Sequence, residues 1–269
     1  MKYKLIVSDI DGTLISKDGK ISKKTKQLVK EYTNKGGNFS IATGRMEATS
    51  MPFVNELDIN TPIIVYNGSA IYDINSQSRV YELKLEMHLA KTALKICRNY
   101  SLDPILYQDK IAYINKLSPS IKKHVEKEKV GCTEVGNLIT FLEKDPIKIL
   151  FIGDPSKFKP FTEHLSKETN KKLNLINSEI NYLELLPNGA SKGNALRELS
   201  KFLRIPIEET IAIGDERNDV SMIKTAGIGV AVKNATIEPK THANYITDED
   251  SYKGVEEILY KAINDIEII

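Results

Sequence analysis

Two carboxylates stand two positions apart near the start of the chain, at Asp9 and Asp11, directly after the apolar run Leu5-Ile6-Val7. The run predicts a buried strand, and Gly12 lets the backbone turn where that strand ends. Open parallel α/β sheets bind ligands at the carboxyl ends of their strands, which is where both acids would lie. Because neighbouring carboxylates repel each other unless a cation or a reaction uses them, the pair predicts metal-assisted chemistry.

Three more polar sites follow predicted strands or begin a predicted helix. They are Thr43-Gly44-Arg45, Lys192, and the segment 215–219, which carries Asp215, Asn218 and Asp219. Taken singly, each has a simpler explanation as a turn residue, a helix cap or a solvated lysine. Together they gather acids, a cation and a hydroxyl at one sheet edge. Carboxylates suit Mg²⁺, and the lysine, the hydroxyl and backbone N–H groups suit phosphoryl oxygens, so the set predicts phosphoryl transfer.

The elements that must position these sites alternate between strand and helix at both ends of the chain. The first segment predicts strands at 4–8, 39–42 and 62–66, with helices at 22–35 and before Pro52. The last segment predicts strands at 210–213, 228–232 and 244–247, with helices at 192–203, up to 225, at 236–242 and from 254. Strands separated by helices indicate an α/β fold with a doubly wound parallel sheet.

The middle of the chain has a different pattern, with short strands that are paired by turns. Strands are predicted at 105–107, 111–115, 147–152, 173–177 and 182–186, and helices at 86–101, 120–129 and 156–169. This pattern favours an inserted α+β domain. We therefore expect a core built from residues 1–82 and 187–269, with residues 83–186 inserted as a second domain.

Composition narrows the classes of partner. The 269 residues carry a net charge of +2 without a dense basic stripe, which disfavours nucleic acid. The two cysteines, Cys97 and Cys132, form no CxxC pattern, and the four histidines are too scattered for a zinc or histidine-phosphatase site. No apolar stretch reaches the ~18 residues of a membrane span, and no signal peptide is evident. We expect a cytoplasmic protein, either a monomer or a small homo-oligomer, without membrane or nucleic-acid partners.

The polar sites resemble, in order, the four signature motifs of the haloacid dehalogenase superfamily of phosphatases, and specifically its Cof-type subfamily (subclass IIB). The matching residues are Asp9-Ile-Asp11-Gly-Thr, Thr43-Gly-Arg45, Lys192-Gly193 and Gly214-Asp215-Glu-Arg-Asn218-Asp219. The likeness spans nearly the whole chain and includes Asn67-Gly68 and the run from Pro187 to Lys192. It implies a Rossmannoid core, with a large α/β cap inserted between the second and third motifs.

The resemblance also implies catalytic roles for four residues. Asp9 would attack phosphorus and become an aspartyl phosphate. Asp11 would protonate the leaving oxygen and then activate water. Thr43 would hydrogen-bond the phosphoryl oxygens, and Lys192 would neutralise their charge and steady Asp9.

Substrate and metal contacts follow from the same resemblance. Gly44, Arg45 and Asn218 would join Thr43 and Lys192 in binding the substrate phosphate. Mg²⁺ would be held by four residues, namely Asp9, Asp11 through its backbone carbonyl, Asp215 and Asp219. Cap residues would form the leaving-group pocket, where the candidates are Tyr107, Asp109, Tyr113 and Glu184, although hairpin residues are more often structural.

The expected activity is Mg²⁺-dependent hydrolysis of a small phosphomonoester, such as a sugar phosphate, a nucleotide-type metabolite, or a flavin or pyridoxal phosphate. One alternative is a phosphomutase or phosphotransferase that passes the phosphoryl group from Asp9 to a sugar, which a bisphosphate product would indicate. Another is a phospho-accepting regulatory module. That module is disfavoured because Asp9 lies on the wrong strand for it and because it has no place for the insertion.

Overall fold

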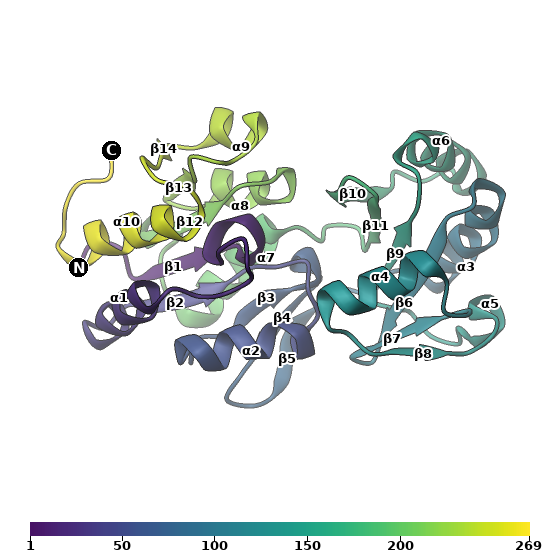
Figure 1. Ribbon diagram of the computed structural model, residues 1–269, viewed down its shortest axis with the longest axis horizontal. Helices are drawn as coiled ribbons and strands as arrows, with labels where there is room; N and C mark the ends of the chain where they lie inside the picture. The colour runs from purple at the N-terminus through teal and green to yellow at the C-terminus, as the bar shows by residue number, and fades with distance from the viewer. The chain divides into compact units, whose positions relative to one another are not determined.

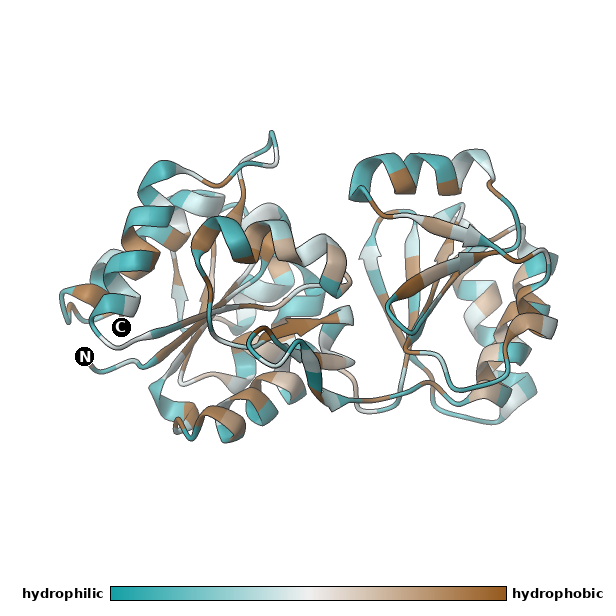
Figure 2. Ribbon diagram, turned by 90° about the horizontal axis from the view of Figure 1, so that it is seen from below, coloured by the Kyte–Doolittle hydropathy of each residue, from teal (hydrophilic) through white to brown (hydrophobic).

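The computed structural model describes residues 1–269, which form two compact units (Figure 1). One unit contains Met1–Tyr81 and Ser191–Ile269, and the other contains Glu82–Ala190. Each has its own sheet, and apolar residues concentrate in the strands of both (Figure 2). The α/β class with a second, inserted α+β unit is confirmed. The expected domain boundaries at 82/83 and 186/187 stay predictions.

The first unit is built on a five-stranded sheet with the order β14-β13-β12-β1-β2. Its strands are β1 (Leu5–Ser8), β2 (Asn38–Ile41), β12 (Thr210–Gly214), β13 (Ile228–Ala231) and β14 (Tyr245–Ile246). All neighbouring strands are parallel. Leu5 of β1 lies opposite Thr210 of β12 on one side and opposite Asn38 of β2 on the other. The predicted doubly wound sheet is therefore confirmed, and the ends of β1 and β12 meet at one edge.

Helices cover both faces of this sheet. Leu5, Val7 and Ala212 pack against α7 (Lys192–Leu203) and α8 (Val220–Thr225). On the other side, α1 (Lys23–Asn34) contacts α10 (Ser251–Ile263) (Figure 1). The hydroxyl of Ser22 caps α1 by accepting from the backbone N–H of Thr25, as its sequence predicts. The remaining helices are α2 (Glu47–Leu57) and α9 (Ile237–His242).

Two features of this unit differ from the expectation. The helix expected before Pro52 runs through it to Leu57, and because Ala48 and Pro52 are both exposed, water can satisfy the carbonyl that loses its partner. In addition, β3 (Ile63–Val65) is followed by two strands that were not predicted, β4 (Ala70–Asp73) and β5 (Ser78–Glu82). They form a three-stranded sheet with β3, which is antiparallel to β4.

The second unit has a six-stranded sheet with the order β10-β11-β9-β6-β7-β8. Its strands are β6 (Asp103–Gln108), β7 (Ile111–Ile114), β8 (Cys132–Glu134), β9 (Lys148–Ile152), β10 (Asn174–Glu179) and β11 (Tyr182–Leu186). Only β7 and β8 pair in parallel. Short β8 was not predicted, nor was the single-turn helix α5 (Leu138–Phe141).

The core of this unit lies on one face of its sheet. Leu106, Phe151 and Leu183 pack there against the helices α3 (Met87–Ile96) and α6 (Phe158–Thr169). The fourth helix, α4 (Pro119–Glu128), begins with a Ser118 cap. In neither unit is a helix both long enough and apolar enough to cross a bilayer.

Candidate active site

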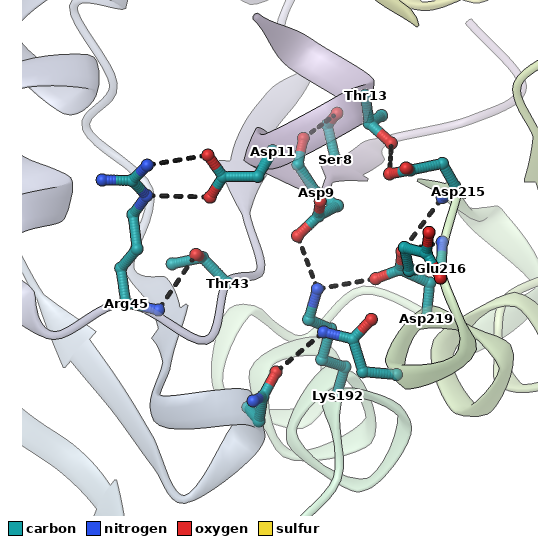
Figure 3. Close-up of polar contacts among 12 residues, drawn as sticks. Ser8, Asp9, Asp11, Thr13, Thr43, Arg45, Lys192, Asp215, Glu216 and Asp219 are labelled. Carbon is teal, nitrogen blue, oxygen red and sulfur yellow. Dashed lines mark hydrogen bonds and ion pairs between the residues drawn. The ribbon is translucent and has the colours of Figure 1, made fainter. Parts of the chain in front are cut away.

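Three carboxylates from two segments of the chain converge at the carboxyl edge of the parallel sheet (Figure 3). Asp9 follows β1, and its backbone N–H donates to the Ile213 carbonyl of β12 at 2.9 Å. Asp215 follows the last residue of β12, and Asp219 comes four residues later. One oxygen of each carboxylate lies within 4.8 Å of the others, and all three residues are buried. The structure thus brings together acids that are more than 200 positions apart in the sequence.

One ammonium group lies among these acids. Lys192 is the first residue of α7, and its Nζ is 2.5 Å from Asp9 Oδ1 and 2.6 Å from Asp219 Oδ1. A cation is normally unfavourable at a helix N-terminus, so these two carboxylates must stabilise it there. The side chain of Lys192 is completely buried, which is rare for lysine without such partners. The cluster therefore holds three potential negative charges against one positive charge.

This imbalance shifts the protonation of the cluster. Burial raises the pKa of Asp9 well above its usual value; Lys192 lowers that pKa, and the carboxylates of Asp219 and Asp215 add to the rise. Burial and the charge of Asp219 raise the pKa of Asp215 to about 7. Burial would lower the pKa of Lys192, but Asp219 and Asp9 outweigh it and raise that pKa. The Lys192 ammonium therefore stays charged. The raised pKa values of Asp9 and Asp215 favour the protonated forms of these acids unless a further cation is present.

The donor set fits Mg²⁺. Its oxygens are carboxylate oxygens, which this hard ion prefers, and no nitrogen or sulfur ligand is among them. The loop backbone packs tightly on the acids, since a Cβ on Gly12 would lie 2.2 Å from Asp215 Oδ2. Asp9, Asp215 and Asp219 are thus the residues able to hold the ion, and the carboxylate of Asp11 is not part of the group.

The loop that carries Asp215 is held by Asp219 and by Thr13, for which the sequence analysis predicts no role. The hydroxyl of Thr13 donates to Asp215 Oδ1 at 2.6 Å. Asp219 Oδ2 accepts from the backbone N–H groups of Asp215 at 2.9 Å and Glu216 at 3.0 Å. Thr13 stands in the same short run as Asp9 and Asp11, which is the one sequence signal that could have identified it.

Asp11 has different surroundings. Arg45 forms a bidentate pair with it, from Nε to Oδ2 at 2.8 Å and from Nη2 to Oδ1 at 2.7 Å. The Asp11 side chain is 52% exposed, whereas that of Arg45 is 13% exposed. Thr43 is buried, and its hydroxyl accepts from the backbone N–H of Arg45 at 3.1 Å. The second motif therefore orients Asp11 at the solvent-accessible side of the site.

Asn218 completes the set of predicted site residues. Its side-chain amide donates to Asn67 Oδ1 at 3.0 Å, so it contacts the turn after β3. Gly44 lies against the same turn, because a Cβ there would approach Asn67 Nδ2 to 2.9 Å. The Asn67-Gly68 pair belongs to the family likeness without a predicted role, and the structure places it in contact with residues from separate motifs.

The four residues predicted for the leaving-group pocket all contact other side chains of the second unit. Glu184 pairs with Lys148 at 2.7 Å, and the Tyr107 hydroxyl lies 3.1 Å from His124 Nε2. Asp109 pairs with Lys144 at 2.5 Å. The ring of Tyr113 packs on that of Phe141, with centroids 4.5 Å apart.

Comparisons with known proteins agree with this geometry. The family model for haloacid dehalogenase-like hydrolases matches residues 6–259. A haloacid dehalogenase-like hydrolase from Bacteroides thetaiotaomicron is 32% identical with a TM-score of 0.87, over 96% of this chain and 99% of that one. Another from Bacillus subtilis is 26% identical with a TM-score of 0.83, over 96% and 99%. The 5-amino-6-(5-phospho-D-ribitylamino)uracil phosphatase of Bacillus subtilis is 28% identical over 94% of this chain and 95% of its own length.

Proposed function

The chain belongs to the haloacid dehalogenase-like hydrolase family and is a phosphatase, and from this premise we propose that it hydrolyses a small phosphomonoester with Mg²⁺, through a phosphoryl group carried on Asp9. The observation that carries the proposal is the buried cluster of three carboxylates around the single ammonium of Lys192. A divalent cation supplies the charge that the cluster lacks. When bound, it screens the repulsion between a carboxylate and a phosphate dianion.

The residues would divide the reaction into two transfers. A carboxylate oxygen of Asp9 forms a bond to phosphorus as the bond to the leaving oxygen breaks, and the Asp11 carboxyl gives that oxygen its proton. Water then attacks the phosphoryl group, Asp11 takes a proton from it, and Asp9 is released together with inorganic phosphate. Splitting the hydrolysis into two steps lowers each barrier. The half-exposed position of Asp11 supports its role, because its proton can exchange with solvent.

The remaining residues would position the phosphoryl group. Lys192 holds Asp9 through its 2.5 Å contact and neutralises charge on the transferring oxygens. Thr43 and Asn218 would donate hydrogen bonds to those oxygens, and the Gly44 backbone would allow their close approach. Arg45 would keep the Asp11 carboxyl in place through its bidentate pair. The Mg²⁺ ligands would be Asp9, Asp215, Asp219 and the backbone carbonyl of Asp11.

We propose further that the unit Glu82–Ala190 acts as a cap that selects the leaving group. Its separate sheet and core support this, because such a unit can move as a body. The proposal predicts that substitutions of the predicted pocket residues Asp109 and Tyr113 change the ratio of KM values among phosphate esters. Substitutions of core-motif residues should lower kcat for all esters alike. Equal effects of cap substitutions on every ester would contradict the proposal.

A substrate panel tests the proposed activity. Aryl, sugar, flavin and pyridoxal phosphates are incubated with the protein and Mg²⁺ or excess chelator, and released phosphate is measured. We expect release that requires Mg²⁺, and an acid-quenched sample should carry a phosphoryl group on the peptide containing Asp9. Release that survives complete chelation would contradict the metal assignment. A bisphosphate product without released phosphate would show phosphotransfer instead.

A further inference from the structure

The turn after β3 has an unusual backbone. Tyr66, Asn67 and Gly68 have φ values of 52°, 54° and 88°, the only three successive positive values in the chain. Glycine adopts this region freely, asparagine less so and tyrosine rarely. Such conformations persist only where the surroundings determine them, and they concentrate at functional sites. All three residues are buried, so the turn is fixed by protein contacts.

The backbone of the turn holds the second motif. The N–H of Tyr66 donates to the Arg45 carbonyl at 2.9 Å, and the N–H of Asn67 donates to the Thr43 carbonyl at 2.9 Å. These bonds fix the backbone on both sides of Gly44. Thr43 and Arg45 therefore take their positions from the left-handed turn, since a turn with negative φ would direct these N–H groups elsewhere.

The next residue in the turn meets the third motif. A Cβ on Gly68 would lie 2.1 Å from the Ser191 carbonyl oxygen and 2.8 Å from the backbone nitrogen of Lys192. The turn thus packs directly on the start of the helix that presents Lys192. Only glycine allows this approach.

The side chain of Asn67 joins the second and fourth motifs. Its Oδ1 accepts from the Asn218 amide at 3.0 Å, and its Nδ2 lies against Gly44. The side chain is fully buried, so water does not compete for these contacts. Asn67 therefore determines the distance between the Thr43 loop and Asn218.

The side chain of Tyr66 anchors the turn from the other side. Its hydroxyl donates to Glu47 Oε2 at 2.6 Å, and Arg79 Nε donates to Glu47 Oε1 at 2.6 Å. Glu47 is the first residue of α2, where a carboxylate is favourable. The turn is therefore held at its start by this buried group and at its end by Ser191.

We propose that Asn67 is a positioning residue for the phosphatase reaction, setting Thr43 and Asn218 at the separation that the transferring phosphoryl group requires. This inference rests on the proposed function. Asn67 itself need not touch the substrate, since it acts through the two residues that it holds. Its effect should fall on stabilisation of the transferring phosphoryl group and not on metal binding, because Asn218, which it holds, is not one of the three clustered carboxylates.

The test is Asn67→Gly, which keeps the left-handed backbone and removes the amide side chain. We expect kcat to fall between about tenfold and a hundredfold, as a small misplacement of positioning groups does. Inhibition by orthovanadate should weaken, while the Mg²⁺ concentration at half-maximal activity stays unchanged. The matched control is Asn170→Gly, at the left-handed residue that ends α6, and it should alter none of these quantities.

Two results separate this inference from the proposed function. Normal kcat and vanadate inhibition in Asn67→Gly would overturn the positioning role and leave the phosphatase assignment intact. Absence of Mg²⁺-dependent hydrolysis in the wild-type protein would instead overturn the proposed function. In that case vanadate binding, measured as a shift in melting temperature, would still test the role of Asn67. If Asn67→Gly does not fold, Asn67→Asp replaces it. That variant keeps an acceptor for the Asn218 amide but replaces the Nδ2 group beside Gly44 with a charged oxygen. It should therefore displace the Thr43 loop and weaken vanadate binding, and unchanged binding would overturn the inference.

Discussion

Each unit of the protein buries a cluster of charged side chains, and the two clusters differ in balance. In the first unit, three carboxylates surround the ammonium of Lys192. In the second, Lys148 and Glu184 form an ion pair at 2.7 Å, and both side chains are nearly inaccessible. Lys148 also lies over the ring of Tyr107, 4.8 Å from its centroid. Burial is therefore common to both clusters, but only the first gathers three carboxylates around one ammonium group.

The difference shows why burial alone does not identify a reactive site. A balanced pair satisfies its own charges, so it needs no ion or substrate, and its main effect is on packing and specificity of the fold. Burial raises the pKa values of Asp9 and Asp215, and the neighbouring carboxylates raise them further. The cluster is therefore left with negative charge that a divalent cation would compensate. We therefore expect the first cluster to govern turnover and the second to contribute mainly to the stability of its unit.

The sharpest test of this distinction is Asp9→Asn. The substitution removes the proposed nucleophile but keeps its shape, so kcat should fall at least about a thousandfold. The fold should persist, because Lys192 keeps its pair with Asp219 and one source of repulsion is lost. Phosphate release and thermal denaturation measure the two effects. The exposed Asp18→Asn serves as the control, and near-normal turnover in a folded Asp9→Asn protein would eliminate Asp9 as the phosphoryl carrier.

The balanced pair should respond in the opposite way. Lys148→Met leaves Glu184 buried without its cation, which should lower the free energy of unfolding by about 3–5 kcal/mol. Adding Glu184→Leu should restore much of that loss, because two apolar side chains can replace a buried ion pair. Urea denaturation of both variants measures the effect.

The exposed Lys159 offers a matched control for this pair. It lies 3.9 Å from Glu163 on the surface of α6, and Lys159→Met should change stability by less than about 1 kcal/mol. If Lys148→Met lowered the free energy of unfolding no more than Lys159→Met does, the buried pair would contribute little to stability. The contrast between the two clusters would then be wrong.

Metal and pH should act together on the unbalanced cluster. The folded pKa of Asp215 is about 7, above its unfolded value of about 3.9, so its contribution to metal-free stability is present at low pH and is lost as pH rises toward 7. Mg²⁺ binds the ionised form, and it should therefore raise the melting temperature more at pH 8 than at pH 5.5. At a hundredfold excess over its Kd the ion adds about 2.7 kcal/mol. Thermal denaturation with Mg²⁺ or chelator measures this.

Asp215→Asn is the control for that experiment. It removes one carboxylate of the group, so the pH-dependent loss of metal-free stability and the gain from Mg²⁺ should both shrink. Equal stabilisation of wild type and variant by Mg²⁺ would show that the ion binds elsewhere.

Much of this arrangement could be predicted from the sequence, because its signals are local. The apolar run before Asp9, the Ser22 cap and the helix beginning at Lys192 each follow from neighbouring residues, and the structure contains all three elements. Parallel strands that end at one edge then bring distant acids together. The predicted site could be assembled from such placements without knowledge of any side-chain contact.

The features that could not be predicted depend on pairs that are distant in the sequence. The bond from Thr13 to Asp215 spans 202 positions, and that from Asn218 to Asn67 spans 151. No local pattern encodes either of them. Strands β4 and β5 were missed for another reason, because they follow β3 without an intervening helix and so break the alternation from which the sheet was predicted. The left-handed conformation of Tyr66 likewise comes from tertiary contacts.

The smallest expected effect concerns the two thiols of the second unit, whose pKa values are raised by burial and not by a cluster of carboxylates. Burial raises the pKa of Cys97 to about 12 and also raises that of the less buried Cys132. At pH 8 a thiol of pKa about 12 is ionised in roughly one molecule in ten thousand, and only the thiolate reacts. Iodoacetamide should therefore label Cys132 before Cys97 in the native protein, and urea should equalise the rates. Labelling of Cys132 should leave turnover unchanged, since a pKa raised by burial alone, without an excess of like charge, marks a structural residue. Loss of phosphate release on labelling would break that rule and place Cys132 near the substrate.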